Sequence, residues 1–498
     1  AMDMIIQSLY VGGRDLQALT LKAYILRMQG KKEEAQETIR YIQQIDPLDY
    51  WSAAETNLSV SQGASFLKAG TNHNSKGIIA VQELLEVVNN YMTIGATEDA
   101  LTLLNSAISL GEPYVSYPLL YYYKAYNLLK GKNTTEFQAC LDKAASLSPL
   151  NNYPFRIEEI VLFTTLLQER PNDALLHYHL GNLLYYLGQK ESGLEHWLHA
   201  TEADPTFAIA ARNVGFGYGC LNDLEKSMKY YDRAINANPN DPLLLTESDK
   251  IYEQANIPAA QRLKRLESHL KTVMKHDDAV MRLLTLYNAT AKYDKAIKIM
   301  DTRHFHLWEG GGQVHDIYVD SHMLKGMQLL KGKQYKEAIR EFDLANQYPA
   351  NLEVAPSLRG GYEAKVYYLS GIAYEAMKQA DKARECFEKS AETHFRDHLT
   401  DLNYYKIKSL RKLNKNEKAD AVLSNMQKTL ERMQQNLMDS YAKFGEANQN
   451  VQQSNISYYS GLIHLLLNNP SAAKNDFNQA IQLYPGNIWA KLMNEDIR

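Results

Sequence analysis

The chain has 498 residues, with 54 basic and 58 acidic side chains and a formal net charge of −4. This near-balance excludes the basic surface typical of nucleic-acid binders, and no polybasic run indicates an anionic membrane surface as a partner. Hydrophobic residues make up 45% and charged residues 22%, the proportions of a chain that buries a core.

The number and spacing of the cysteines and the length of the apolar runs exclude further classes of protein. Cys140, Cys220 and Cys386 are far apart and odd in number, so they predict neither a zinc site nor a disulfide framework. The longest apolar stretches, such as VLFTTLL at 161–167, are too short to cross a bilayer, and the first residues do not form a signal peptide. Ala1-Met2 has the form of a cloning remnant, which leaves the natural start and the compartment open.

The first third of the chain predicts degenerate helical pairs at 16–49, 81–114 and 118–151. A polar stretch at 58–78 predicts a loop between the first two pairs. Residues 152–173 predict one helix, PFRIEEIVLFTTLLQ, which ends before Pro171.

Two neighbouring segments, 174–207 and 208–241, carry the clearest repeat. Gly181, Trp197, Ala200 and Pro205 return 34 residues later as Gly215, Tyr231, Ala234 and Pro239. The glycine lets two helices approach closely, the aromatic side chain fills the gap beside it, and the small alanine permits a tight crossing. The proline ends the second helix. This pattern predicts helix pairs that stack along the chain.

Further pairs follow at 277–302, 319–350, 364–397, 400–433 and 454–487. Gly/Pro-bearing segments at 309–313 and 350–361 predict loops between units, and 425–452 predicts a long polar helix. A final helix at 488–497 is expected to cover the apolar face of the last repeat.

These units resemble the tetratricopeptide-repeat (TPR) family in their Leu-Gly, Tyr, Ala, aromatic, Ala and Pro positions. The resemblance implies an all-α fold, a right-handed TPR solenoid of about ten helix pairs that serves as a binding scaffold. Within one continuous solenoid, we expect N-terminal units at 1–151, central units at 152–310, and C-terminal units with a capping helix at 311–498.

A narrower resemblance rests on NYPFRIEEI (152–160), LHYHLGNLLY (176–185), ARNVGFGYG (211–219), RHFHLWEGGGQVH (303–315) and YPANLEV (348–354). These passages are similar, in this order, to bacterial multi-domain proteins in which TPR units follow a β-rich N-terminal domain of unknown function. The resemblance runs from about residue 81 to the end. It implies that the chain is the C-terminal portion of a larger protein, and it implies no reaction.

In the TPR family, the first helix of each pair lines the concave surface. Counting positions on that helix predicts a partner-binding surface formed by Tyr122, Tyr126, Tyr178, Asn182, Tyr185, Arg212, Asn213, Phe216, Tyr368 and Tyr458. Tyrosine suits peptides or sugars, because it combines a flat apolar face with a hydroxyl. The alternative is that these tyrosines pack between helices.

Asn182 and Asn213 also match the two asparagines of the TPR clamp that holds a chaperone's C-terminal carboxylate. The cations of that clamp are absent here, since Tyr178, Leu243 and Glu247 stand in their places. Without charge-assisted bonds to the carboxylate, this clamp is not expected.

The segment 303–315 has the most unusual local chemistry. His306, Trp308, Glu309 and His315 would form a ligand-binding loop if Trp308 stacked on a ligand. The structural alternative is an inter-repeat loop anchored by Phe305 and Trp308, with glycines at positive φ. The spacing does not match a recognised metal site, and His394 and His398 lack a third ligand. We therefore expect no metal.

No GxSxG, P-loop, HExxH or dinucleotide motif is present, so we expect no enzyme activity and no cofactor. The sequence favours a non-catalytic scaffold that binds a protein or peptide, with neither nucleic-acid binding nor membrane insertion. The alternative is a helical support module of a larger carbohydrate-processing protein, in contact with sugar or with an upstream domain.

Overall fold

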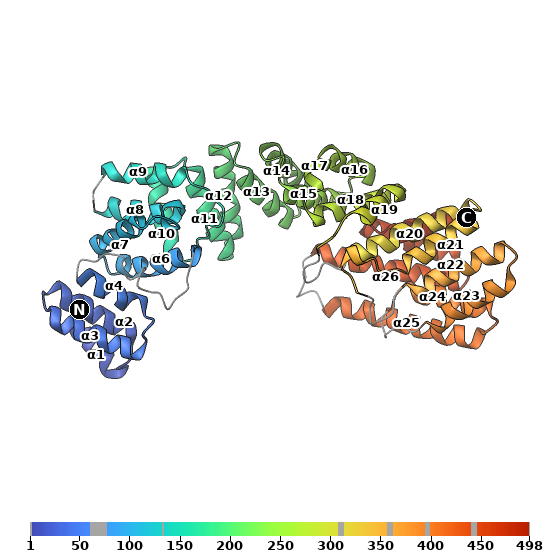
Figure 1. The fold of residues 1–498 in the computed structure, drawn as a ribbon, viewed down its shortest axis with the longest axis horizontal. Helices are drawn as coiled ribbons and strands as arrows, with labels where there is room; N and C mark the ends of the chain where they lie inside the picture. The colour runs from blue at the N-terminus through green and yellow to red at the C-terminus, as the bar shows by residue number, and fades with distance from the viewer. Residues whose placement is uncertain are drawn as a thin grey trace. The chain divides into compact units, whose positions relative to one another are not determined.

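The computed structural model describes residues 2–59, 77–131, 134–306, 313–355, 362–393, 399–439 and 446–497. Within these ranges the chain is built from α-helices, with two short 3₁₀ helices and no strand. Internal contacts divide the chain into two units, residues 1–217 and 218–498 (Figure 1). The all-α architecture expected from the sequence is confirmed, and the three-part division remains a prediction.

The first unit contains helices of 10 to 16 residues and ends within α13. Its helices are α1 (Met2–Val11), α2 (Leu16–Met28), α3 (Lys32–Ile45), α4 (Tyr50–Ser59), α6 (Ile78–Thr93), α7 (Thr97–Ser109), α8 (Pro118–Lys130), α9 (Thr134–Ala145), α10 (Glu158–Glu169), α11 (Ala174–Tyr186), α12 (Lys190–Ala203) and α13 (Ala208–Cys220), with the 3₁₀ helix η1 at Tyr114–Ser116.

The second unit continues the alternation of paired helices and includes the two longest helices, α25 and α26. Its helices are α14 (Leu224–Ala237), α15 (Pro242–Gln254), α16 (Ala259–Ser268), α17 (Leu270–Val273), α18 (Asp277–Ala289), α19 (Tyr293–Thr302), α20 (Gln313–Lys331), α21 (Tyr335–Ala345), α22 (Glu363–Ala376), α23 (Ala380–Glu392), α24 (Leu402–Lys412), α25 (Asn416–Asp439), α26 (Glu446–Leu466), α27 (Pro470–Leu483) and α28 (Ile488–Asp496), with the 3₁₀ helix η2 at Ala350–Leu352.

Glycine–aromatic pairs hold the two helices of a repeat together. A Cβ atom built on Gly181 of α11 would lie 2.5 Å from Trp197 Cδ1 of α12. Three more pairs share this geometry, because a Cβ on Gly326, Gly371 or Gly461 would collide with the ring of Phe342, Phe387 or Phe477. All four aromatic side chains are buried. The role assigned to the repeat glycine is therefore confirmed in both units.

The turn within each repeat also recurs. Among the described residues, ten turns contain a residue with a left-handed backbone conformation. In each of them the next backbone N–H bonds back to the carbonyl five residues earlier, the pattern of a Schellman motif. The left-handed residues are Gly30, Gly95, Gly188, Asn222, Asn256, Ala291, Lys333, Lys378, Asn414 and Asn468. The spacing of 34 residues from Gly188 to Asn222, and again to Asn256, matches the repeat length read from the sequence.

Several boundaries differ from expectation. The helix expected from Pro154 begins only at Glu158, because residues 152–156 form an extended segment. The pair α15–α16, with its left-handed Asn256, was not recognised from the sequence. The long polar helix expected at 425–452 corresponds to parts of α25 and α26, and residues 440–445 between them lie outside the described residues.

The last helix, α28, packs on α27, and its side chains also reach the middle of the second unit. Trp489 Nε1 donates a hydrogen bond of 2.9 Å to Asp320 Oδ1 of α20. The ammonium of Lys365, from α22, lies 2.9 Å from the centre of the Trp489 ring. Thus α28 covers the end of the last repeat, as expected, and its Trp489 also contacts Lys365 and Asp320, which lie 124 and 169 residues earlier in the chain.

Candidate partner-binding surface and pocket

A polar ladder joins α11, α12 and α13 in the first unit. Trp197 Nε1 donates to Asn182 Oδ1 at 2.9 Å, and Asn213 Nδ2 donates to the same oxygen at 3.0 Å. Arg212 Nη1 then donates to Asn213 Oδ1 at 3.1 Å. The ladder fixes the side-chain orientation of both asparagines, because their oxygens accept these bonds.

Aromatic side chains lie next to this ladder. Tyr185 stacks on Trp197 with ring centres 4.8 Å apart, and its ring centre is 6.0 Å from that of Phe216. The guanidinium carbon of Arg212 lies 5.6 Å from the centre of the Phe216 ring. Phe216 is 39% exposed, unusual for a phenylalanine on a packed helix. A cation, two amides and two rings therefore form one cluster, which we call the α11–α13 surface: Asn182, Tyr185, Arg212, Asn213 and Phe216.

The structure brings these five sequence-predicted residues together, whereas four of the other predicted tyrosines are buried. Tyr122, Tyr178, Tyr368 and Tyr458 are buried, with at most 8% of their surface exposed. Burial raises the pKa of Tyr178, although a hydrogen bond with Asn182 lowers it in part. Tyr126 is half-buried on α8, with the Lys130 ammonium 5.3 Å from its ring centre. Burial favours the packing alternative for the first four.

The segment before α10, residues 152–157, contacts α6 through Arg156 and α11 through Asn152. Its side chains alternate: Asn152, Pro154 and Arg156 are buried, whereas Tyr153, Phe155 and Ile157 are 62%, 45% and 66% exposed. Arg156 anchors the segment through Glu86 at 2.7 Å and Gln82 at 2.8 Å. This segment was expected to be helical, and its tertiary bonds explain why it is not.

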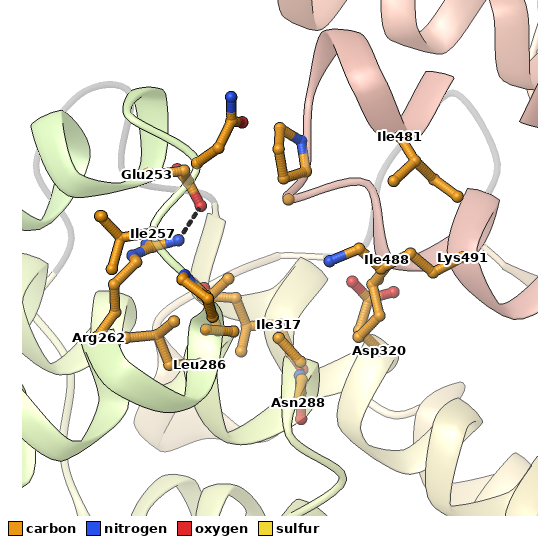
Figure 2. Close-up of a pocket in the computed structure, with 17 residues that line it drawn as sticks. Glu253, Ile257, Arg262, Leu286, Asn288, Ile317, Asp320, Ile481, Ile488 and Lys491 are labelled. Carbon is orange, nitrogen blue, oxygen red and sulfur yellow. Dashed lines mark hydrogen bonds and ion pairs between the residues drawn. The ribbon is translucent and has the colours of Figure 1, made fainter. Parts of the chain in front are cut away.

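The second unit contains a pocket of about 270 Å³ (Figure 2). Apolar side chains supply much of its wall, among them Ile257, Leu286, Ile317, Ile481 and Ile488. Figure 2 shows Asp320, Ile488 and Lys491 on one side of the pocket, opposite Ile257 and Arg262. An apolar group with a hydrogen-bonding end suits these walls.

A buried ion-pair network stiffens one wall of this pocket. Arg262 binds Asp249 through two bonds, of 2.9 and 2.7 Å, and Glu253 through a third of 2.9 Å. Arg282 joins the same two carboxylates at 2.7 and 3.0 Å. Burial pushes the pKa of Asp249 upward, but the two arginines outweigh it and leave that pKa below its usual value. Two cations and two anions thus hold α15, α16 and α18 together.

Asp320 gives the opposite wall a titratable group. Burial raises its pKa to about 7, although Lys365 and the Trp489 hydrogen bond act in the other direction. With a pKa of about 7, the carboxyl group is partly protonated near neutral pH, so it can donate or accept a hydrogen bond. No local sequence pattern indicates this pocket, because residues between 253 and 491 meet only after the chain folds.

The residues of the expected ligand-binding loop occupy different surroundings. The His306 side chain is 81% exposed. His315 is buried, stacks on Tyr348 with ring centres 4.0 Å apart, and bonds the Gln347 carbonyl at 2.9 Å. His315 thus participates in packing between α20 and the segment before Pro349. Trp308 and Glu309 lie outside the described residues, so their role in a loop remains a prediction.

Comparison with known families adds the decisive observation. The family model described as tetratricopeptide repeat matches residues 218–241 and 364–393. The first segment spans the end of α13 and α14, and the second spans α22 and α23. These matches support the assignment of the chain's paired helices to the tetratricopeptide-repeat family. TPR arrays are interaction scaffolds for other proteins, and this coarse function fits an array of paired helices.

Several solved structures are also similar to this TPR chain at low identity. MamA from Desulfovibrio magneticus RS-1 is 18% identical, with 39% of this chain and 93% of that chain covered and a TM-score of 0.22. The C-terminal part of a TPR repeat-containing protein from Cytophaga hutchinsonii is 12% identical, covers 54% and 98%, and has a TM-score of 0.33. YrrB, described as a TPR protein with an unusual peptide-binding site, is 16% identical, covers 46% and 91%, and has a TM-score of 0.20.

None of the helices in the described part of the TPR chain is both long enough and apolar enough to cross a membrane.

Proposed function

We propose that this TPR chain binds an extended segment of a partner protein at the α11–α13 surface. The observation that supports this most directly is the joining of Asn182, Asn213 and Arg212 in one ladder beside the exposed ring of Phe216. Asn213 is 7% exposed, so its role in this proposal is to position Asn182 and Arg212 through the ladder. The ring and the guanidinium suit side chains.

The composition of the surface also indicates the preferred segment. Arg212 donates to Asn213 and lies over Phe216, and its guanidinium adds positive charge to the surface, which suits a carboxylate. Phe216 and Tyr185 together offer an apolar contact. A segment with an acidic residue next to an apolar or aromatic residue fits both features. The carbohydrate-support alternative remains a prediction, and no observation in either unit favours it over peptide binding.

A peptide-display selection against the intact chain tests this proposal. The parent protein is expected to enrich peptides with an acidic residue beside an apolar one. Synthetic versions of these peptides are then titrated against Arg212→Ala and Phe216→Ala, and about a ten-fold or greater loss of affinity is expected for each, as for hot-spot residues. Tyr186→Ala is the matched control, because Tyr186 is 72% exposed on the same helix as Tyr185.

Two outcomes would count against this surface. The first is that no peptide is enriched above an unrelated helical protein. The second is that Tyr186→Ala and Phe216→Ala weaken the selected peptides equally, which would place the contact elsewhere on the chain.

A further inference from the structure

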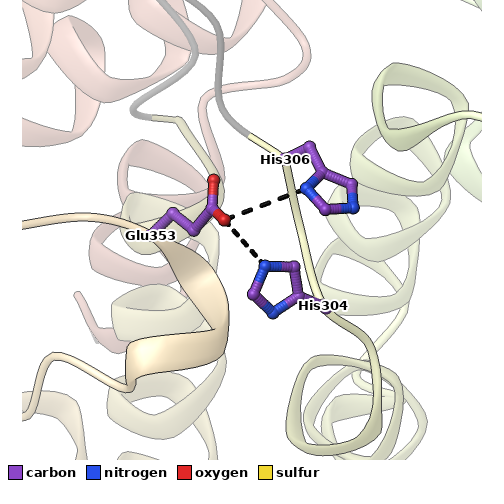
Figure 3. A group of neighbouring side chains, drawn as sticks. All are labelled: His304, His306 and Glu353. Atoms are coloured by element: carbon purple, nitrogen blue, oxygen red, sulfur yellow. Dashed lines mark hydrogen bonds and ion pairs between the residues drawn. The ribbon is translucent and has the colours of Figure 1, made fainter.

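His304, His306 and Glu353 form a compact group in the second unit (Figure 3). His304 Nε2 lies 2.7 Å from Glu353 Oε1, and His306 Nδ1 lies 3.8 Å from the same oxygen. The ligand atoms of all three side chains lie within 4.8 Å of one another. Figure 3 shows both imidazoles directed toward the carboxylate from one extended segment, with Glu353 on the facing turn.

The backbone on both sides of this group is fixed by tertiary bonds. Phe305, between the two histidines, is 1% exposed, and its N–H donates to the Asn351 carbonyl at 2.9 Å. Asn351 Nδ2 in turn donates to the carbonyls of Met300 and Arg303 at 2.6 and 2.8 Å. The segment with the histidines and the turn with Glu353 are therefore held at a set separation before any ligand binds.

A further anchor lies on the other side of the histidine segment. Arg303 pairs with Asp277 at 2.6 Å, and the His306 backbone N–H donates to Asp277 Oδ2 at 2.9 Å. With Phe305 buried, residues 304 and 306 project to the same side, as alternate residues of an extended chain do. Packing thus buries Phe305, the residue between the histidines, and leaves both imidazoles exposed to solvent.

We propose that His304, His306 and Glu353 bind a divalent transition-metal ion of the zinc type. Two imidazole nitrogens and one carboxylate oxygen form a ligand set that suits Zn²⁺, whereas Mg²⁺ and Ca²⁺ prefer oxygen ligands alone. Three protein ligands leave at least one coordination position for water.

Binding would exchange one interaction for several. The contacts of Glu353 with His304 and His306 are replaced by coordination of all three groups to the ion, which requires neutral imidazoles and an ionised carboxylate. The side chains of His304, His306 and Glu353 are 53%, 81% and 39% exposed, so the ion reaches them from solvent without unfolding a repeat. The bound ion would also link the segment after α19 to the turn after η2.

A second histidine group, on α11 and α12, provides the internal control. His177 Nδ1 lies 2.9 Å from His196 Nδ1, and His177 Nε2 bonds the Pro171 carbonyl at 2.9 Å. His199 completes this group, with its ring centre 5.1 Å from that of His177. Both nitrogens of His177 already have partners, so this group is expected to contribute little to zinc binding.

The test is a titration of the intact chain with Zn²⁺ by calorimetry, repeated with Co²⁺ by visible absorption. One ion per chain is expected for the parent. His306→Ala is expected to weaken binding at least about ten-fold, and Glu353→Gln to weaken it in the same direction. Circular dichroism confirms that both variants are folded, and His306→Ala is the safer variant because that side chain is mostly exposed.

Each alternative outcome overturns the proposal. Zinc binding that survives His306→Ala and is lost in His199→Ala would place the ion at the α11–α12 histidines. Absence of a saturable zinc isotherm for the folded parent, or equal binding of Mg²⁺, would exclude a transition-metal site at this group.

Discussion

Trp197 donates its indole N–H to the side-chain oxygen of Asn182 at 2.9 Å, so the core aromatic residue of one repeat positions an amide of the proposed binding surface. The same ring fills the space that Gly181 leaves open. Packing inside the repeat and the geometry of the α11–α13 surface are therefore coupled through one side chain. Changes in the repeat core are expected to affect both stability and binding.

The first prediction concerns the glycine of the repeat. Gly181→Ala places a Cβ 2.5 Å from Trp197 Cδ1, and overpacking of this kind is expected to lower the free energy of unfolding by about 1–3 kcal/mol. Urea denaturation followed by circular dichroism measures the change. Gly131→Ala is the matched control, because a Cβ there meets nothing closer than 3.4 Å. Equal stability of the two variants would contradict the close approach of α11 and α12.

The second prediction separates buried from exposed tyrosines. Tyr178 is 5% exposed, so Tyr178→Ala is expected to lower the free energy of unfolding by roughly 3 kcal/mol through cavity formation. Tyr186→Ala removes a side chain that is 72% exposed, and a change within about 0.5 kcal/mol is expected. Thermal unfolding of both variants decides between packing and surface roles. Full stability of Tyr178→Ala would contradict the burial of the Tyr178 side chain between helices.

The third prediction concerns the attachment of α28. Trp489→Ala removes the hydrogen bond to Asp320 and the contact with the Lys365 ammonium. Amide hydrogen exchange in residues 488–496 is expected to accelerate, because fewer contacts then hold this helix. Trp489→Phe keeps a ring for Lys365 but lacks the N–H, so an intermediate effect is expected. Unchanged exchange in both variants would show that α27 alone holds α28.

The fourth prediction uses pH. The pKa of Asp320 is about 7 in the folded chain and close to 4 when unfolded, so the folded chain binds more protons between these values. Its contribution to stability is therefore present below pH 4 and is lost as the pH rises toward 7. Asp320→Asn keeps an acceptor for Trp489 and removes this titration.

The measurement is urea denaturation of parent and Asp320→Asn at pH 5 and pH 7.5. The variant is expected to lose less stability than the parent between the two values. The ion pair between Lys365 and Asp401, at 2.9 Å, is present in both the parent and the variant, so it does not contribute to the difference between them. Parallel loss in the two proteins would show that Asp320 is ionised throughout this range.

The repeat was predictable wherever its packing depends on residue type. Gly181 and Trp197, spaced within one unit, identified the helix pair because only glycine admits the aromatic ring so close to the backbone. The pair α15–α16 lacks this signature and was missed, although Pro242 at its first helical position and Asn256 in its turn were available as signals.

The candidate sites were less predictable. Asn182 and Asn213 were found because they match the two asparagines of the TPR clamp, and they are bonded at 3.0 Å. Tyr122 and Tyr458 were also assigned to the concave surface, but they are buried. The sequence does not show how closely the next helix approaches each of these tyrosines. The pocket is lined by residues from Glu253 to Lys491, and no local pattern encodes a site formed by residues so far apart in the chain.

The ten left-handed turns have a consequence for how the array melts. Seven of these turns place Asn, Ala or Lys where glycine is the least strained residue, and Ala291, Lys333 and Lys378 have no amide side chain to favour that conformation. In a chain of stacked repeats, each turn influences mainly its own pair and the neighbouring pairs. Glycines introduced at Lys333 and Lys378 would reinforce those two pairs selectively. We therefore expect the residues at these turns to influence the order in which segments of the second unit unfold on heating.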